Sequence, residues 1–343
     1  MQWKTRWGLY VKTNFYKNKY ILILLIIYFS FRLVNLKIIP IFNDEAIYLD
    51  WGWREIYSGN LYYSLYDAKQ PLLMWIFGVF ETFLPDPLFA GRLVSVFLGT
   101  LTVTGLYKIG KQFFSSYTAI IAALFYIVIP IFSFYDRQAL MESAIGAVGV
   151  WAGYYIFYYL QKPQKKYAAI CGLILGTGFF IKSTTILFLF STICVFILKT
   201  YLDKINRKEH LLNILIFLGV FFISIFLLLI NPQFWQTLPS NSRYALTFSE
   251  LMKFPVYTWI KNIFINGEIL FFFLTPFIFI FGIVGLYRNL STQSFQNKIF
   301  IFYAILPFLF QILLVKDPSQ RYIVSILPLF CIISAYGFIN EFK

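Results

Sequence analysis

Two neighbouring segments indicate how the chain is organised: YILILLIIYFSFRLVNL, residues 20–36, and DEAIYLDWGWREIYS, residues 44–58. The first is a largely apolar run, and about 20 such residues are enough to cross roughly 30 Å of hydrocarbon. The second places acids and aromatic residues together a few positions further on. This order predicts a membrane-spanning helix followed by a polar segment outside the bilayer.

Similar apolar runs recur along nearly all of the 343 residues, of which 59% are hydrophobic and only 13% charged. The mean hydropathy of +0.71 also lies well above ordinary soluble usage. We therefore expect an all-α integral membrane protein, one membrane domain over residues 1–343 with about ten transmembrane helices. The expected spans are 20–36, 88–108, 117–134, 140–160, 168–181, 183–199, 211–231, 269–287, 298–315 and 322–340.

The distribution of charge predicts the orientation of these spans. If segment 1–19 is cytoplasmic, the inner segments carry most of the 29 basic residues, as the positive-inside rule requires. Of the 15 acids, only Asp203, Glu209 and Glu341 fall on that side. The net charge of +14 is thus explained by topology, and the dispersed basic residues form no stripe for nucleic acid. We expect the active face to be non-cytoplasmic, at the plasma membrane if the protein is prokaryotic.

Cysteine and histidine offer little chemistry. Cys171, Cys194 and Cys331 all fall inside apolar segments, where they behave as small hydrophobic residues, and neither a disulfide nor a zinc site is expected. His210 lies in a basic connection at the edge of a span, which favours a structural role. No cleavable signal peptide is expected, because a long basic stretch precedes the first span and no small-residue cleavage site follows it.

The first outer loop, residues 37–87, is the most acidic segment. Its acids are Asp44, Glu45, Asp50, Glu55, Asp67, Glu81 and Asp86. Asn43 is a candidate N-cap, and carboxylates in a first helical turn favour a helix start. A second apolar stretch, 72–84, is too short to span. We expect two interfacial helices joined by a turn at 66–71, and a second large outer loop at 232–268.

Two other outer connections carry charged residues. The first contains Asp136, Arg137 and Glu142, and ionisable groups at the edge of an apolar span usually line a cavity or path. The second contains Lys316, Asp317, Arg321 and Tyr322. A guanidinium matches the geometry of phosphate, which lipid headgroups and lipid-linked donors present at the outer leaflet. The alternative for Arg321 is an interface anchor.

Five short motifs, taken in order, resemble the GT-C superfamily of membrane glycosyltransferases, in the branch of the protein O-mannosyltransferases and lipid A aminoarabinose transferases. They are Asp44-Glu45 with Tyr48, Lys69-Gln70-Pro71, Ala90-Gly91-Arg92-Leu93 with Ser95 and Gly99, Arg137 through Glu142, and Arg321-Tyr322 with Pro328. Relatives often have proline at the place of Gln70 and aspartate at that of Glu142. Many also have further spans or a soluble C-terminal domain, so acceptor choice is left open.

The resemblance implies transfer of a hexose or pentose from a polyprenyl-phosphate donor to an acceptor hydroxyl on the non-cytoplasmic face, with inversion, as in the synthesis of cell-envelope glycans. The partners implied are membrane lipid, the lipid-linked donor and a glycan, lipid or protein acceptor. No cofactor is required for certain, and a divalent cation held by Asp44 and Glu142 is left open.

The resemblance also implies roles for individual residues. Asp44 would be the general base, Glu45 its neighbour or acceptor-orienting partner, and Glu142 or Asp136 the acid that completes the site. The candidates for binding the donor phosphate are Lys69, Arg137 and Arg321. Tyr48 and Tyr322 would line the substrate.

Simpler interpretations stand beside these roles. Asp44 and Glu45 could merely favour a helix start, Lys69 could be an ordinary loop charge, and Arg92 is expected to pair structurally with an acid of the first outer loop. Two other functions are a multi-span secondary transporter and a non-catalytic lipid-binding assembly subunit. The acids gather at one face and not at the midplane, which disfavours the transporter.

Overall fold

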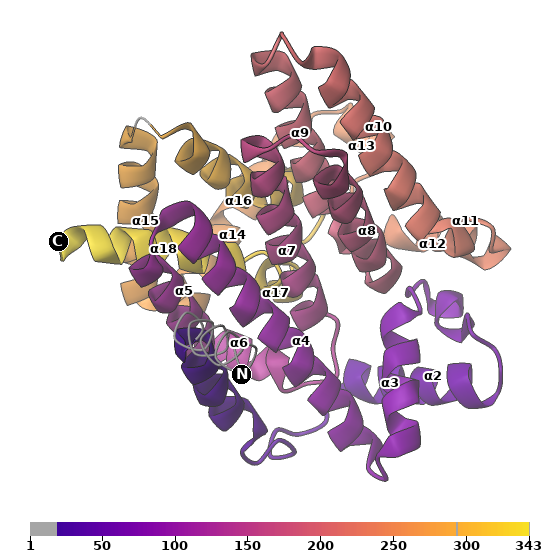
Figure 1. Cartoon of the computed structure of the whole chain (residues 1–343). Helices are drawn as coiled ribbons and strands as arrows, with labels where there is room; N and C mark the ends of the chain where they lie inside the picture. The colour runs from indigo at the N-terminus through magenta and orange to yellow at the C-terminus, as the bar shows by residue number, and fades with distance from the viewer. Residues whose placement is uncertain (1–18, 293, 343) are drawn as a thin grey trace, which may run out of the picture.

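The computed structural model describes residues 19–292 and 294–342, whose regular structure is helical apart from one isolated bridge between Ala245 and Val315. After a first helix at 19–33 the elements are α2 (Asn43–Tyr57), η1 (Tyr63–Asp67), α3 (Leu72–Phe83), α4 (Pro87–Ile109), η2 (Gly110–Phe114), α5 (Ser116–Val128), α6 (Pro130–Asp136), α7 (Glu142–Gln161), α8 (Lys165–Ile181), η3 (Ser183–Thr185), α9 (Ile186–Leu202), α10 (Arg207–Ser224), α11 (Phe226–Leu229), α12 (Pro232–Asn241), α13 (Phe248–Leu251), α14 (Val256–Phe273), α15 (Thr275–Ser291), α16 (Phe295–Leu314), α17 (Gln320–Val324) and α18 (Pro328–Glu341). Figure 1 shows their arrangement.

Candidate membrane spans are fewer than the sequence predicts. Among the described residues, three helices are long and apolar enough: Pro87–Phe114, Ser183–Leu202 and Phe295–Leu314. Two bent pairs, α5 with α6 and α14 with α15, raise the number to five if each pair is one span. The ten expected spans all fall on helical segments, but a count of ten is not confirmed. The segment 1–18 of the expected cytoplasmic N-terminus lies outside the described residues.

Breaks in the apolar segments explain part of this difference. The expected span 117–134 bends by 68° before Pro130, which opens α6 because proline tolerates the first helical turn but not an interior position. The last expected span is likewise divided, and Pro328 opens its second part, α18. A third break separates α14 from α15 by a bend of 115° at Thr275, whose φ of 64° lies in the left-handed region.

The helices form two packed groups around α4 and α7. α7, α8, α9 and α10 lie side by side, and α5, α15 and α18 pack together on the other side of α4 (Figure 1). A close approach of α15 and α18 depends on Gly285 and Gly337, because a Cβ on either would clash with backbone atoms of the other helix. Small residues allow such contacts where apolar helices have only van der Waals packing to hold them together.

Residues 37–87, the expected first outer loop, contain two helices as their sequence predicts. α2 and α3 lie against one another at one end of the molecule (Figure 1). They cross at Gly52 and Gly78, where a Cβ on Gly78 would meet the backbone of Gly52. Asn43 is the first residue of α2 and not its N-cap, a position that Phe42 occupies. The predicted cap was therefore wrong by one residue, although the acids do lie in the first turn.

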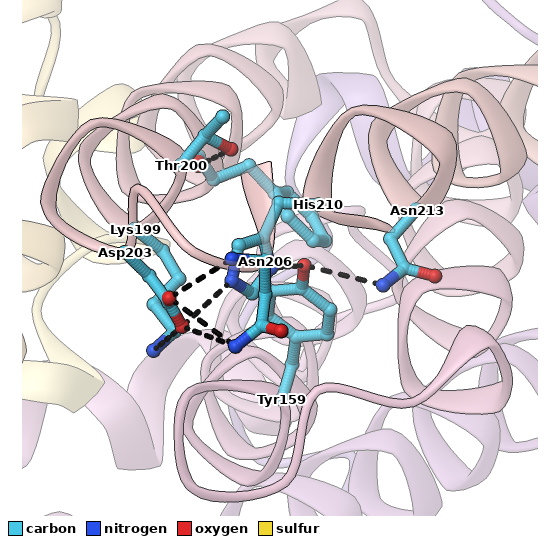
Figure 2. Close-up of polar contacts among 8 residues, drawn as sticks. Tyr159, Lys199, Thr200, Asp203, Asn206, His210 and Asn213 are labelled. Carbon is cyan, nitrogen blue, oxygen red and sulfur yellow. Dashed lines mark hydrogen bonds and ion pairs between the residues drawn. The ribbon is translucent and has the colours of Figure 1, made fainter. Parts of the chain in front are cut away.

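His210 has a structural role at the C-terminal end of α7, which it contacts through Tyr159. Its buried ring bonds the hydroxyl of Tyr159 through Nδ1 at 2.7 Å and the carboxylate of Asp203 through Nε2 at 3.1 Å (Figure 2). These contacts tie the connection between α9 and α10 to α7. The bond from His210, with that from Lys199, keeps the pKa of Asp203 below its usual range. Tyr159 lies 17 residues beyond Glu142, about 25 Å along a helix.

Candidate functional site

Three distant segments meet at Arg321. Its Nε donates to Glu142 Oε1 at 2.8 Å and its Nη2 to Oε2 at 3.4 Å, while Nη1 donates to Asp44 Oδ2. Asp44 lies in the first turn of α2, Glu142 is the first residue of α7, and Arg321 is the second residue of α17. The segments expected to be the first and last outer connections are thereby joined at the start of a central helix.

A second cation, Lys182, approaches Glu142 from another direction. Its Nζ lies 2.8 Å from Glu142 Oε1 and 5.8 Å from the ring centre of Tyr322. Lys182 stands between α8 and η3, where the chain turns back. Burial lowers the pKa of the Lys182 ammonium; Glu142 opposes this shift, and the charges of Arg321 and Lys69 add to it. Glu142 is therefore a buried anion held by two cations.

Glu45 has a different environment from its neighbour Asp44. Its carboxylate accepts from Arg92 Nε and Nη2, both at 2.8 Å, and from the backbone N–H of Ala139, also at 2.8 Å. Arg92 further donates to the carbonyl of Leu36 at 3.0 Å. This buried cluster connects α4, the start of α2 and the loop before α7. Because Glu45 holds that loop three residues before Glu142, it fixes the distance between Asp44 and Glu142.

Asp136 belongs to a separate buried cluster. Its carboxylate accepts from Arg32 Nε at 3.2 Å, Tyr28 at 3.0 Å and Tyr126 and Ser143 at 2.8 Å each. These partners come from helix 19–33, α5 and α7. A small cavity of about 10 Å³ lies between Asp136 and Glu142, and Ser143 also lines it. That volume is about one probe sphere, the least that a buried water requires.

The remaining residues singled out in the sequence are distributed around these clusters. Arg137 Nη2 donates to the carbonyls of Val34 and Asn35 at 2.8 and 2.6 Å, after the end of helix 19–33. Lys69 is half-buried and close enough to affect Lys182 electrostatically. Tyr48 is buried beside the site, where burial and the neighbouring acids raise its pKa against the effect of Arg321.

The candidate site consists of Asp44, Glu142, Arg321 and Lys182. Three residues that the sequence analysis placed in the site do not bond to any of these four side chains. Glu45, Asp136 and Arg137 each bind partners in neighbouring clusters. Lys182 was missed as a site residue, although it is the single charge between two apolar runs, and an isolated ionisable residue among spans marks a functional candidate. Arg32, alone in the first apolar run, gave the same signal for the Asp136 cluster.

A divalent cation does not fit between Asp44 and Glu142 in this arrangement. The guanidinium of Arg321 contacts both carboxylates at the place where a shared cation would bind. Over the described ranges 19–292 and 294–342, no three His, Cys, Asp or Glu side chains gather closely enough to hold a metal ion.

What this arrangement can do follows from its charges. A partly exposed carboxylate can accept a proton, and an adjacent guanidinium and ammonium can hold a phosphate or another anion. The carboxylate and the cations come from α2, α17 and the turn after α8, all on the side of the molecule where α7 begins. An alcohol and an anionic leaving group could therefore be held side by side.

Comparison with known proteins supports the resemblance read from the motifs. Residues 68–232 match the family model described as dolichyl-phosphate-mannose-protein mannosyltransferase. The matched segment contains Lys69, Asp136, Glu142 and Lys182. A search of curated proteins found no match. The predicted resemblance to this branch of the GT-C glycosyltransferases is confirmed by the family match.

Solved structures share the fold over nearly the whole chain. The ArnT structure from Cupriavidus metallidurans bound to undecaprenyl phosphate superposes with a TM-score of 0.68 at 16% identity, covering 95% of this chain and 60% of that one. The Archaeoglobus fulgidus oligosaccharyltransferase in complex with Zn and sulfate gives a TM-score of 0.65 at 13% identity, covering 94% and 49%. The chain thus spans about half to three fifths of the length of these proteins, and the likeness establishes an all-α, GT-C-like fold.

Proposed function

We propose that this chain is a membrane glycosyltransferase that moves a sugar from a polyprenyl-phosphate donor to an acceptor hydroxyl on the non-cytoplasmic face. The single observation that carries the proposal is the contact of Arg321 with both Asp44 and Glu142, which brings a partly exposed carboxylate next to a guanidinium of the kind that binds phosphate. The match of residues 68–232 to the mannosyltransferase family and the undecaprenyl phosphate bound to ArnT support the class of donor.

In the proposed reaction Asp44 is the general base. As the acceptor hydroxyl attacks the anomeric carbon, its proton passes to the Asp44 carboxylate and a new carbon–oxygen bond forms. The bond between that carbon and the phosphate oxygen breaks, and the lipid phosphate leaves with the electron pair. Attack opposite the leaving group inverts the anomeric configuration. General-base assistance of this kind contributes typically about 10²- to 10⁴-fold to a rate.

The cations stabilise the leaving phosphate. Arg321 and Lys182 both donate to Oε1 of Glu142, and the half-buried Lys69 is nearby. We propose these three as the donor-phosphate ligands, with Tyr48 and Tyr322 lining the substrate. Glu142 then acts by holding Arg321 and Lys182 together, because its carboxylate is already bonded to both. Preorganised charges of this kind stabilise a leaving group without having to move during the reaction.

Neighbouring residues position this site without contacting substrate. The Glu45 cluster holds Asp44 near Glu142, and the Asp136 cluster holds the start of α7 through Ser143. Arg137 is proposed to fix the end of helix 19–33, not to bind the donor, because its Nη2 is bonded to the two carbonyls there.

A panel of sugars carried on undecaprenyl phosphate tests the proposal. The purified protein in lipid nanodiscs is incubated with each donor, and release of the free lipid phosphate is followed by mass spectrometry. We expect release from at least one donor, faster when an acceptor alcohol is added. If all donors persist intact over a panel of hexoses and pentoses, the protein is not a transferase of this class, and binding or transport becomes the better account.

A further inference from the structure

We propose that Asp44 and the phosphate of the donor compete for Arg321, so that donor binding frees the carboxylate that receives the proton. This inference rests on the proposed function and adds to it an order of binding, donor before acceptor. It also gives Asp44 a second role, as a determinant of donor affinity.

The two carboxylates that Arg321 binds differ in exposure. The side chain of Glu142 is 0% exposed, whereas that of Asp44 is 32% exposed and that of Arg321 21%. Glu142 is also held by Lys182, while Asp44 forms no other ion pair in the part of the chain that the structure describes. Asp44 is therefore the partner of Arg321 that an arriving anion can replace, and Glu142 is the partner that stays.

The charges of the site favour this exchange. Asp44 and Glu142 carry two negative charges, which Arg321 and Lys182 balance. If a phosphate entered while Asp44 was still bonded to Arg321, the charges of Arg321 and Lys182 would already be neutralised by the two carboxylates, and the phosphate would gain little attraction. Guanidinium groups bind phosphate and carboxylate through the same planar set of N–H donors, so the phosphate can take the N–H of Nη1 that Asp44 holds.

The exchange changes what Asp44 can do. In the structure Oδ2 of Asp44 accepts a charge-assisted hydrogen bond from Arg321, so this oxygen is engaged and not open to an acceptor hydroxyl. Once phosphate takes Nη1, Oδ2 becomes a free acceptor beside the newly bound donor. Both oxygens of the Asp44 carboxylate can then face the acceptor hydroxyl, so proton uptake by this base is favoured when the leaving group is in place.

Equilibrium binding of undecaprenyl phosphate, without a sugar, tests the competition. Affinity is measured by native mass spectrometry on the full chain in nanodiscs for wild type and D44N. We expect D44N, which removes the competing charge, to bind the lipid about three- to tenfold more tightly, where tenfold corresponds to about 1.4 kcal/mol. The matched control is D50N on the same helix, whose carboxylate pairs with Arg54 and is 50% exposed. It makes the same change in net charge and should leave affinity unchanged.

A double-mutant cycle assigns the effect to Arg321. In an R321Q background there is no guanidinium to compete for, and D44N should no longer alter affinity. The competition is overturned if D44N binds the lipid with equal or lower affinity than wild type. It is also overturned if D50N shows the same gain in affinity, or if D44N still raises affinity in the R321Q background. Absence of lipid binding in every variant overturns it too. Tighter lipid binding by D44N, together with no turnover of any sugar donor by wild type, supports the competition and rejects the proposed transferase. Turnover by wild type without the gain in affinity for D44N does the reverse.

Discussion

Glu45 and Arg92 form an ion pair at 2.8 Å in which neither side chain is exposed. The adjacent acid, Asp44, instead forms an ion pair with Arg321 of α17. Two consecutive carboxylates of one helical turn therefore have different roles. Glu45 holds α2, α4 and the loop before α7 together, whereas Asp44 is partly exposed and open to a substrate.

Replacing Glu45 with Gln should destabilise the protein and not merely inactivate it. The substitution leaves the buried guanidinium of Arg92 without its countercharge, and breaking one partner of a buried pair typically costs about 3–5 kcal/mol. Thermal unfolding in detergent should show a clear drop in melting temperature. A variant with wild-type stability and no transferase activity would instead assign Glu45 to the reaction.

Asp136→Asn should have the same kind of effect, because Arg32 would then be a buried cation without a carboxylate. The control is D50N, which breaks the exposed pair with Arg54, and such surface pairs contribute only about 0–1 kcal/mol. We expect the melting temperature of D136N to fall well below that of D50N. Equal melting temperatures would mean that the Asp136 cluster does not hold the start of α7.

Lys182→Met should weaken donor binding more than it slows the bound complex. The ammonium is lost, but Glu142 keeps its bonds to Arg321, so the rest of the site stays in place. Steady-state kinetics should show a raised KM for donor. As a control, Lys261→Met removes an exposed lysine of α14 that pairs with Asp317. An unchanged KM in K182M would remove this lysine from the donor site.

Stability should depend on pH through Glu55 of α2. Burial raises the pKa of this carboxyl to about 7, against the bond that it accepts from the N–H of Ser64 at 2.8 Å. A raised folded-state pKa means that the protonated form is favoured by folding. This contribution is fully present below the unfolded value of 4.5 and is lost as pH rises through about 7.

Melting temperatures of wild type and Glu55→Gln between pH 5 and pH 8.5 test this dependence. Wild type should lose more stability than E55Q across the upper part of that range, because glutamine cannot ionise. The half-buried Glu81, whose pKa desolvation also raises to about 7, remains in both proteins, so some common slope is expected. Parallel curves for the two proteins would show that Glu55 is not the titrating group.

The sequence predicted the helical class and the segments that meet at the site, because apolar runs and clustered charges are local properties. It did not predict which acid pairs with which base. Asp44 and Glu45 are adjacent acids that the sequence alone does not distinguish. Only the packing of α4 against α2 shows that Glu45 is the acid buried with Arg92. Lys182 was overlooked because its place in the site depends on its contact with Glu142, which lies 40 positions earlier in the sequence. The count of ten spans is not confirmed, in part because hydropathy does not register bends such as that at Thr275.

Donor turnover by D44N tests the central claim most directly. Release of free lipid phosphate is measured for wild type and D44N with the sugar donor that wild type uses best, and melting temperatures are recorded on the same samples. If Asp44 is the base, D44N should lose about 10²- to 10⁴-fold in turnover rate while its melting temperature stays close to that of wild type. A folded D44N protein that releases lipid phosphate at the wild-type rate would contradict the account.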